Sequence, residues 1–317
     1  MQHPTYNIGE EITVHDDWKV KIESALGKSN NLHYTYLCQP LNKDSEKVVL
    51  KKYNYARHSA NQLQEIAQAS FAHFNRTRDQ LLAAGFPNMR FYDNIHSITD
   101  YVPGHTLEGH TPSQAINDRV TYIRDLLLSL TEPMEGLRQA GLVHRDIKPS
   151  NIVVRPDVVP GMKGAATPID LDSLTPILTT RPLVKPSAVY GSGRHIPAEV
   201  SSLGFHQFES DVYALGVTGI EMIERYLSMT ILGRYTETCW NFWDFAEARQ
   251  LNKWLLRDRW PQLVEDVSKS PYSLDPRSVR QVLGFIHECL HDEASDRPKN
   301  GEVMRQLLAD TGNIKEL

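Results

Sequence analysis

A short polar segment at residues 143–154, VHRDIKPSNIVV, holds the side chains of this chain best suited to chemistry. Asp146, Lys148 and Asn151 stand within six residues of one another. A carboxylate can hold or deprotonate a hydroxyl, an ammonium can neutralise a phosphate, and an amide oxygen can ligate Mg²⁺. Phosphoryl transfer needs such groups together, because it depends mainly on positioning and charge neutralisation. Asp146, Lys148 and Asn151 could fill these three roles.

The same segment resembles the catalytic loop of the eukaryotic-like serine/threonine protein kinases, whose pattern is HRDxKPxN. The residues that match this pattern are His144, Arg145, Asp146, Lys148, Pro149 and Asn151. A lysine two positions after the aspartate looks like the serine/threonine branch of that family rather than the tyrosine branch. The resemblance implies ATP and Mg²⁺ as cofactors, a Ser or Thr of a protein substrate as acceptor, and Asn151 as a metal ligand.

TPIDLDSL, residues 167–174, is similar to the DFG segment of the family. The resemblance assigns Asp170 to Mg²⁺ as a catalytic residue and puts Leu171 in the hydrophobic place of the Phe. Asp172 stands at the Gly position and departs from the pattern. Its carboxylate could ligate a second ion or be solvated at the strand end, and both interpretations stay open. The variant also resembles small-molecule kinases of the same fold, which keeps a nonprotein acceptor as an alternative.

EKVVLKKY, residues 46–53, looks like the family strand whose lysine binds the α- and β-phosphates, which implies that role for Lys51. Lys52 points to the opposite face, because strand side chains alternate. The family pairs such a lysine with a helix carboxylate, and the acidic candidates on the helix predicted next are Glu65 and Asp79. Both lie on nearly the same helix face. We favour Glu65, because its side chain reaches farther, and Asp79 remains the alternative.

The phosphate-covering loop is the weakest match to the family. ALGKSNNLHYTYL, residues 25–37, aligns with GxGxxG through Gly27, whereas Ser29 and Leu32 stand where the other glycines belong. Glycine is favoured there because backbone N–H groups must closely approach the phosphates. The departure keeps a second alternative open, a pseudokinase that binds nucleotide and acts as a scaffold.

SITDYVPGHTL, residues 97–107, resembles the hinge between the two lobes of the family. The resemblance implies Thr99 as the gatekeeper and adenine contacts from the backbone of Asp100, Tyr101 and Val102. Together with Gly27, Lys51 and Glu65, these three residues form the predicted nucleotide-binding set.

Family landmarks continue in order beyond the DFG-like segment. PAE at residues 197–199 resembles the APE motif, with Ser192 ahead of it. Asp211 stands where an Asp braces the catalytic loop, and Arg297 is placed to pair with Glu199. Arg145 stands directly before Asp146, and the resemblance implies that this arginine pairs with a phosphate on the activation segment, as it often does in family members with an arginine there. We therefore hypothesise that Thr179 or Thr180 is autophosphorylated.

The secondary structure that positions these groups is predicted by two different hydrophobic patterns. Between residues 18 and 100, short β-branched and aromatic runs predict strands, interrupted by one helix over residues 60–84. Apolar steps of three to four residues then predict helices over 115–140, 211–228, 243–260 and 275–290. The resemblance implies an α+β, bilobal protein-kinase-like fold, with a β-rich N-lobe containing one long helix at residues 1–100 and a mainly α-helical C-lobe at residues 101–317.

The stretch at residues 239–260 contains four of the five tryptophans of the chain. Such aromatic density could mark a docking surface. Core packing is the favoured interpretation, because the helical spacing by itself predicts a buried face.

Composition excludes several other classes of protein. The 34 basic and 39 acidic residues give a net charge of −5, so no overall basic field favours nucleic acid or anionic lipid as a partner. Three cysteines without a CxxC pair predict core thiols rather than a metal or redox site. Early charges interrupt any secretory signal, and no apolar run approaches the ~18 residues of a membrane span. These features predict a cytoplasmic protein and leave its oligomeric state open.

Overall fold

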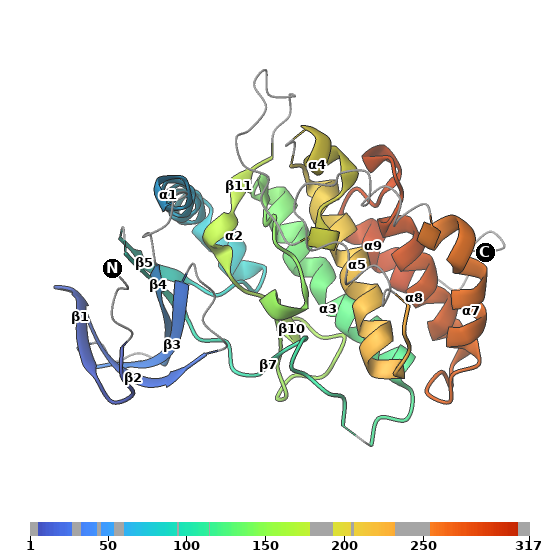
Figure 1. Ribbon diagram of the computed structural model, residues 1–317, viewed down its shortest axis with the longest axis horizontal. Helices are drawn as coiled ribbons and strands as arrows, with labels where there is room; N and C mark the ends of the chain where they lie inside the picture. The colour runs from blue at the N-terminus through green and yellow to red at the C-terminus, as the bar shows by residue number, and fades with distance from the viewer. Residues whose placement is uncertain are drawn as a thin grey trace.

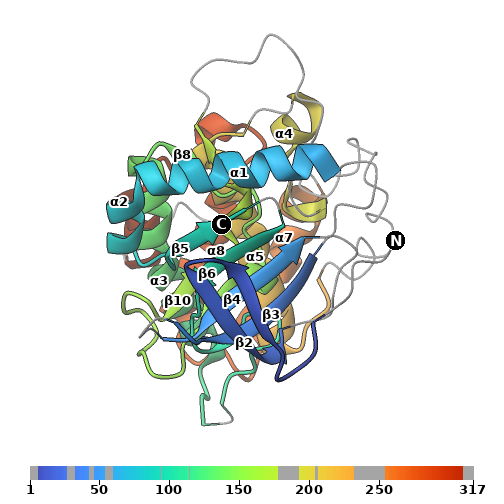
Figure 2. The same ribbon diagram turned by 90° about the vertical axis from the view of Figure 1, so that its left-hand side faces the viewer.

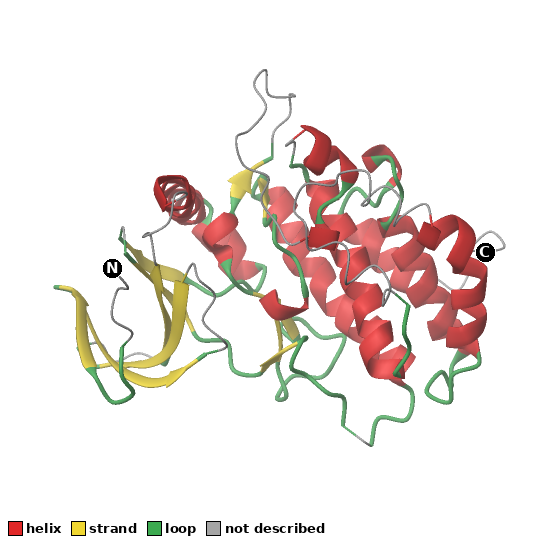
Figure 3. Ribbon diagram, in the orientation of Figure 1, coloured by secondary structure: helices red, strands yellow, loops and turns green. Residues whose placement is uncertain are grey.

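The computed structural model describes residues 6–26, 33–42, 46–53, 60–93, 95–113, 115–177, 193–203, 206–231 and 254–309. A curled sheet lies at one end of the molecule and most of the helices lie at the other (Figure 1). Figure 3 shows the same division by secondary structure. The predicted α+β class with a sheet-rich and a helical part is confirmed. The boundary between residues 100 and 101 stays a prediction.

The six-stranded sheet is antiparallel throughout and has the order β1-β2-β3-β4-β6-β5. Its strands are β1 (Glu11–His15), β2 (Trp18–Ala25), β3 (His33–Pro40), β4 (Val48–Tyr53), β5 (Met89–Tyr92) and β6 (His96–Asp100). Alternate side chains such as Val20, Cys38 and Leu50 form a buried cluster on one face. Because strand side chains alternate, Lys51 projects from the opposite face.

The long helix expected over residues 60–84 is two helices, α1 (Ala60–Arg76) and α2 (Arg78–Ala83). The break lies at Thr77, whose hydroxyl donates to the His73 carbonyl at 3.0 Å. Thr77 has φ −115° and ψ 16°, outside the helical range. A threonine hydroxyl competes in this way for helix carbonyls, and the apolar period alone does not show such a break. Figure 2 shows α1 running past the sheet, where it contacts β5.

The helical part surrounds a large apolar core. Its main helices are α3 (Arg119–Gln139), α4 (Ala198–Leu203), α5 (Phe208–Leu227), α7 (Trp260–Ser268), α8 (Pro276–Cys289) and α9 (Gly301–Ala309). Side chains cap two starts: Asp118 accepts from the Thr121 N–H at 3.1 Å, and Asp275 accepts from the Ser278 N–H at 3.1 Å. These caps satisfy N–H groups that the first helical turn leaves free.

Part of the tryptophan-rich stretch can be placed. Trp260 is buried in the large core, in agreement with the packing interpretation. It begins α7 and follows a π-helical turn, Trp254–Arg259. Residues 232–253, with most of the helix expected over 243–260, lie outside the described residues.

Short strands connect the two parts and frame the polar segment at 144–151. β7 (His105–Thr106), β9 (Ile152–Val154) and β10 (Ala166–Pro168) form one small sheet, and β8 (Leu142–Val143) pairs with β11 (Thr175–Pro176). Gly104 has φ +142°, and a Cβ built there would lie 2.1 Å from the Val154 carbonyl oxygen. Only glycine therefore allows the backbone of the Pro-Gly turn to lie this close to β9.

Candidate active site

The backbone of the HRD segment is held by a buried carboxylate on α5. The N–H groups of His144 and Arg145 donate to the two oxygens of Asp211 at 2.5 and 2.9 Å. Burial raises the pKa of Asp211, and the neighbouring His144 only partly opposes this effect. Arg145 has φ +70°, an uncommon backbone conformation for this residue type. The bracing role expected for Asp211 is confirmed by these contacts.

The loop that follows brings together the three groups expected from their spacing. Lys148 Nζ lies 2.8 Å from Asp146 Oδ2. Asn151 Nδ2 donates to the carbonyl oxygen of Asp146 at 2.9 Å and to its Oδ2 at 2.8 Å. Because the amide nitrogen binds Asp146, the side-chain oxygen of Asn151 is left to act as a metal ligand.

Asp170 lies beside this loop because β9 and β10 pair antiparallel. The Ile169 N–H donates to the Asn151 carbonyl at 2.8 Å, and His144 Nε2 lies 3.0 Å from the Ile169 carbonyl oxygen. Asp170 itself has φ +67°, and Leu171 after it is 1% exposed in the core. Asp170 is thus a left-handed residue next to a buried side chain, and such backbone outliers cluster at functional sites.

Lys51 projects from the sheet and contacts Asp170. Its Nζ pairs with Asp170 Oδ1 and lies 2.8 Å from Asp172 Oδ2. Only 12% of the Lys51 side chain and 17% of the Asp172 side chain are exposed, so this ion pair is partly shielded from water. The solvated interpretation of Asp172 is therefore wrong in this structure.

The expected pairing of Lys51 with a helix carboxylate is also wrong in this structure. Glu65 on α1 and Asp79 on α2 are exposed, and neither pairs with Lys51 within the described residues. The cause is the rotation of α1 about its axis, which turns Ala67 and Ser70 inward. The Ser70 hydroxyl lies 2.9 Å from the carbonyl oxygens of both Asp172 and Leu174, so it fixes α1 to the DLD segment.

Comparison with known proteins agrees with this arrangement of side chains. The family model of the protein kinase domain matches residues 35–309. The chain belongs to the protein kinase domain family. It is 28% identical over 140 residues to serine/threonine-protein kinase PknA of Nostoc sp., a match that covers 43% of this chain and 23% of that protein.

Two further relatives carry similar names. Serine/threonine-protein kinase C of Synechocystis sp. is 30% identical over 138 residues, which are 41% of this chain and 24% of that protein. Mitogen-activated protein kinase kinase kinase 3 of Arabidopsis thaliana is 25% identical over 234 residues, 72% of this chain and 30% of that protein. The matches span about a quarter of the length of the two cyanobacterial relatives.

Charge pairing sets the protonation state of the kinase site. Burial favours the neutral amine of Lys51, but the carboxylates of Asp170 and Asp172 outweigh it and raise the pKa of Lys51. Burial likewise disfavours the charged carboxylate of Asp170, but Lys51 outweighs it and holds the pKa of Asp170 below its ordinary range. Both groups are therefore ionised at neutral pH, as phosphate and metal binding require.

His33, Tyr53 and Ser70 are site residues that no sequence motif indicated. Burial, and then the Lys51 charge, lower the pKa of His33 at the start of β3, so its imidazole is neutral near pH 7. Burial and the Asp172 charge raise the pKa of Tyr53, whose hydroxyl lies 3.0 Å from Ser97 Oγ. A signal was available for His33 and Tyr53. Strand side chains alternate between the two faces of a sheet, and His33 on β3 and Tyr53 on β4 lie on the same face as Lys51.

The segment expected to form the hinge uses the N–H groups of Asp100 and Tyr101 for hydrogen bonds within the protein. The N–H of Asp100 donates to the Asn88 carbonyl at 2.9 Å, and that of Tyr101 donates to the Lys47 carbonyl at 3.1 Å. The Asp100 carboxylate pairs with Arg90. Among the described residues, the Val102 N–H has no hydrogen-bond acceptor, so it is the one of these three N–H groups that is left to donate. Gly27 lies outside the described residues.

The end of the activation segment is fixed to the helical part. Arg297 Nη1 and Nη2 donate to the two carboxylate oxygens of Glu199 at 2.6 and 3.1 Å, which confirms their expected pairing. The Arg297 side chain is 0% exposed. Arg145 Nε donates to the Ser173 carbonyl at the start of this segment. Thr179, Thr180 and Ser192 lie outside the described residues.

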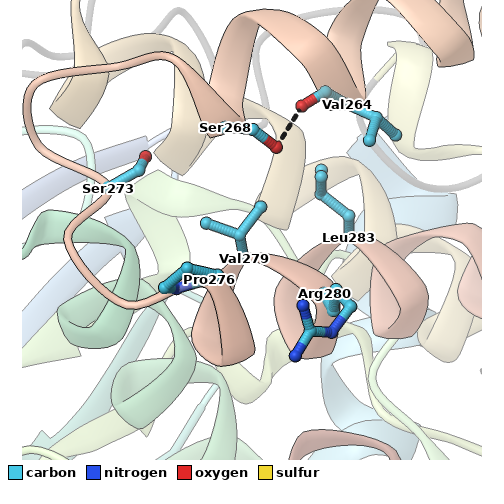
Figure 4. Close-up of a pocket in the computed structure, with 7 residues that line it drawn as sticks. All are labelled: Val264, Ser268, Ser273, Pro276, Val279, Arg280 and Leu283. Atoms are coloured by element: carbon cyan, nitrogen blue, oxygen red, sulfur yellow. Dashed lines mark hydrogen bonds between the residues drawn. The ribbon is translucent and has the colours of Figure 1, made fainter.

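A separate cavity of about 140 Å³ lies between α7 and α8, far from the six-stranded sheet (Figure 4). Its walls are mainly apolar and come from Val264, Pro276, Val279 and Leu283. Ser268 at its rim donates to the Val264 carbonyl at 2.6 Å. The cavity is too small for a nucleotide and has no part in the kinase site.

Proposed function

We propose that this chain transfers the γ-phosphoryl group of ATP to Ser or Thr residues of protein substrates. The observation that carries the proposal is that polar side chains from the sheet and from the helical part lie together in one site. These side chains are Lys51 from the sheet and Asp146, Lys148, Asn151 and Asp170 from the helical part. The names of the serine/threonine-kinase relatives support the same acceptor.

Each of these side chains has a distinct role in the proposed reaction. Asp146 holds the acceptor hydroxyl and takes its proton as the hydroxyl oxygen bonds to the γ-phosphorus and the bond from that phosphorus to the departing ADP oxygen breaks. Lys148, 2.8 Å from Asp146, neutralises the charge that develops on the phosphoryl oxygens. Lys51 leaves Asp170 to bind the α- and β-phosphates, and the Val102 N–H binds the adenine edge.

The residues present fit a divalent metal of the Mg²⁺ class. The Asp170 carboxylate and the Asn151 amide oxygen are hard oxygen ligands on adjacent strand ends. Mg²⁺ bound there would neutralise phosphate oxygens and keep the transferred group in line. Asp170 is ionised at neutral pH, because Lys51 lowers its pKa against the effect of burial. The protonation state required for this ligand set is therefore already present.

Autophosphorylation of Thr179 or Thr180 and a cytoplasmic location are further parts of the proposal. Arg145 lies at the start of the activation segment through its bond to the Ser173 carbonyl, where it could meet a phosphate. Among the described helices, none is long and apolar enough to cross a membrane. The location is proposed because ATP is plentiful in the cytoplasm and the buried Cys38 and Cys289 are free thiols.

One observation favours a second candidate, a nucleotide-binding scaffold without transfer. Glu65 is exposed, and Lys51 pairs instead with Asp170, the expected metal ligand. If that contact persisted with nucleotide bound, Asp170 could not serve the metal. A small-molecule acceptor remains the third alternative, because Asp172 is an added carboxylate in the site.

Transfer of labelled γ-phosphate from MgATP to the chain itself and to a generic basic protein tests the proposal. Wild type is expected to label Ser or Thr, and Asp146→Asn and Asp170→Ala are expected to abolish labelling. Asp79→Asn, which changes an exposed carboxylate on α2, is the matched control and should retain activity. If a variant with acidic residues in place of Thr179 and Thr180 bound nucleotide but transferred no phosphate, the scaffold would be favoured. Labelling of a metabolite alone would favour the third alternative.

A further inference from the structure

A cluster of metal-binding side chains lies at the C-terminal end of α8, outside the kinase site. The sequence there is HECLH, residues 287–291, and it contains His287, Glu288 and His291. One ligand atom from each lies within 4.8 Å of the other two. All three side chains are partly exposed, so an ion could enter from solvent. α8 lies beside α7 and α9, at the end of the molecule away from the sheet (Figure 1).

The distances within the cluster suit one shared ion. Glu288 Oε1 lies 3.7 Å from His287 Nδ1, and Glu288 Oε2 lies 3.5 Å from His291 Nε2. Zn²⁺ binds nitrogen and oxygen ligands at about 2.0–2.2 Å, which places neighbouring ligands of a tetrahedral site about 3.4 Å apart. The two histidine–carboxylate distances are close to this spacing, and the ligand atoms of all three residues lie within 4.8 Å of one another, so side-chain movements of about an ångström bring both imidazoles and the carboxylate into coordination.

The surroundings of the cluster hold it in place. The His287 ring meets the buried Trp260 ring edge-on, with centroids 5.2 Å apart. The rings of His287 and His291 are nearly perpendicular at 83°, with centroids 5.3 Å apart. α8 ends at Cys289, and the negative end of a helix dipole favours a cation at this position.

We propose that His287, Glu288 and His291 bind one Zn²⁺ ion, with water completing the coordination. Two imidazoles select a transition metal over Mg²⁺ or Ca²⁺, which prefer oxygen ligands throughout. The spacing HExxH also occurs in zinc hydrolases, where both histidines lie on one helix and the glutamate is a base. Here His291 lies beyond the helix and Glu288 lies between the imidazoles, so Glu288 is a ligand and the site is a binding site.

Zinc at this site would connect α8 to the residues after it, which include Arg297, the partner of Glu199. The His291 carbonyl accepts a hydrogen bond from Arg297 Nε at 2.8 Å. Arg297 in turn makes the paired contact with Glu199. An ion that fixes His291 to α8 therefore also restrains the backbone on which Arg297 depends, and it should stabilise the helical part.

Zinc titration of the metal-free chain, without a histidine tag and in excess Mg²⁺, tests the site. Wild type is expected to take up one Zn²⁺ and to melt about 2–4 °C higher when it is saturated. His287→Asn and His291→Asn should each weaken uptake at least about tenfold. His15→Asn is the matched control, because His15 is exposed and has a single carboxylate partner, Asp17, at 3.7 Å. Its zinc affinity should equal that of wild type.

The melting temperature of each variant is compared with that of wild type in the presence of a chelator, without bound metal. This comparison shows whether each variant is folded. Substitution of Co²⁺ for zinc supplies a second measurement, because imidazole ligation changes the visible spectrum of cobalt. A cobalt band in wild type that is lost in His291→Asn supports the site. Failure of wild type to take up stoichiometric zinc, or equal uptake by the folded His287→Asn and His291→Asn variants, would overturn the proposal.

Discussion

Lys51 Nζ on β4 lies 2.8 Å from Asp172 Oδ2, in the segment that also carries Asp170. The partner that neutralises Lys51, the proposed phosphate-binding residue, is therefore two residues from the proposed metal ligand, whereas Glu65 on α1 is exposed. α1 contributes the Ser70 hydroxyl, which binds the backbone of the DLD segment. In this protein kinase domain, the charge balance of Lys51 does not depend on a helix carboxylate within the described residues.

Asp172→Asn should impair nucleotide binding, since Lys51 loses the carboxylate 2.8 Å away that holds its ammonium in the site. We expect kcat/KM for ATP to fall about tenfold, mainly through KM, which corresponds to about 1.4 kcal/mol. Lys51 should also react faster with an amine reagent at constant pH. Glu65→Gln is the control and should match wild type. The opposite ranking of the two variants would restore the helix carboxylate as the partner of Lys51.

Asp211→Asn should loosen the catalytic loop, because a neutral amide replaces the carboxylate that accepts the His144 and Arg145 N–H groups. Hydrogen bonds to charged groups contribute about 1.5–3 kcal/mol, so we expect a loss of that size in unfolding free energy together with a lower kcat. Urea denaturation and single-turnover kinetics measure the two effects. Asp157→Asn, at an exposed surface pair with Arg155, should change neither. Wild-type stability in Asp211→Asn would contradict this role.

Glu199→Gln should destabilise the helical part strongly, because it leaves the fully buried guanidinium of Arg297 without its ionic partner. Breaking one side of a buried ion pair costs about 3–5 kcal/mol. The comparison is Glu302→Gln, whose partner Arg305 is exposed and for which a loss of less than about 0.5 kcal/mol is expected. Denaturant melts of both variants measure the difference, and equal losses would refute the assignment of Arg297 as a structural anchor.

His206 should make the stability of the kinase depend on pH. Burial, and then the charge of Arg145, lower the pKa of His206 to about 3, against about 6.5 in the unfolded chain. The unfolded state therefore binds more protons between these values, and stability is lost as the pH falls from about 6.5 toward about 3. The slope approaches about 1.4 kcal/mol per pH unit.

Denaturant melts between pH 7 and 5 measure this slope. His206→Asn should flatten it, and His15→Asn, at an exposed position, should not. An unchanged slope in His206→Asn would show that His206 is not the titrating group.

Local features of the chain could be predicted from the sequence. The groups of Asp146, Lys148 and Asn151 meet because six consecutive residues in one loop cannot separate far. The strand and helix regimes follow from hydrophobic periods of two and of three to four residues, which each element expresses by itself. Asp211 and Arg297 were assigned by motif order, and both contacts were confirmed.

The tertiary structure alone decided which carboxylate meets Lys51. Each helix residue turns the next side chain by about 100°, so Glu65 and Ser70 face directions about 140° apart, and the rotation of α1 about its axis decides which of them faces the site. That rotation depends on packing of α1 against β5 and residues 171–176, contacts between segments far apart in the chain. The proximity of Asp172 to Lys51 depends on such long-range contacts as well, and no local period encodes it.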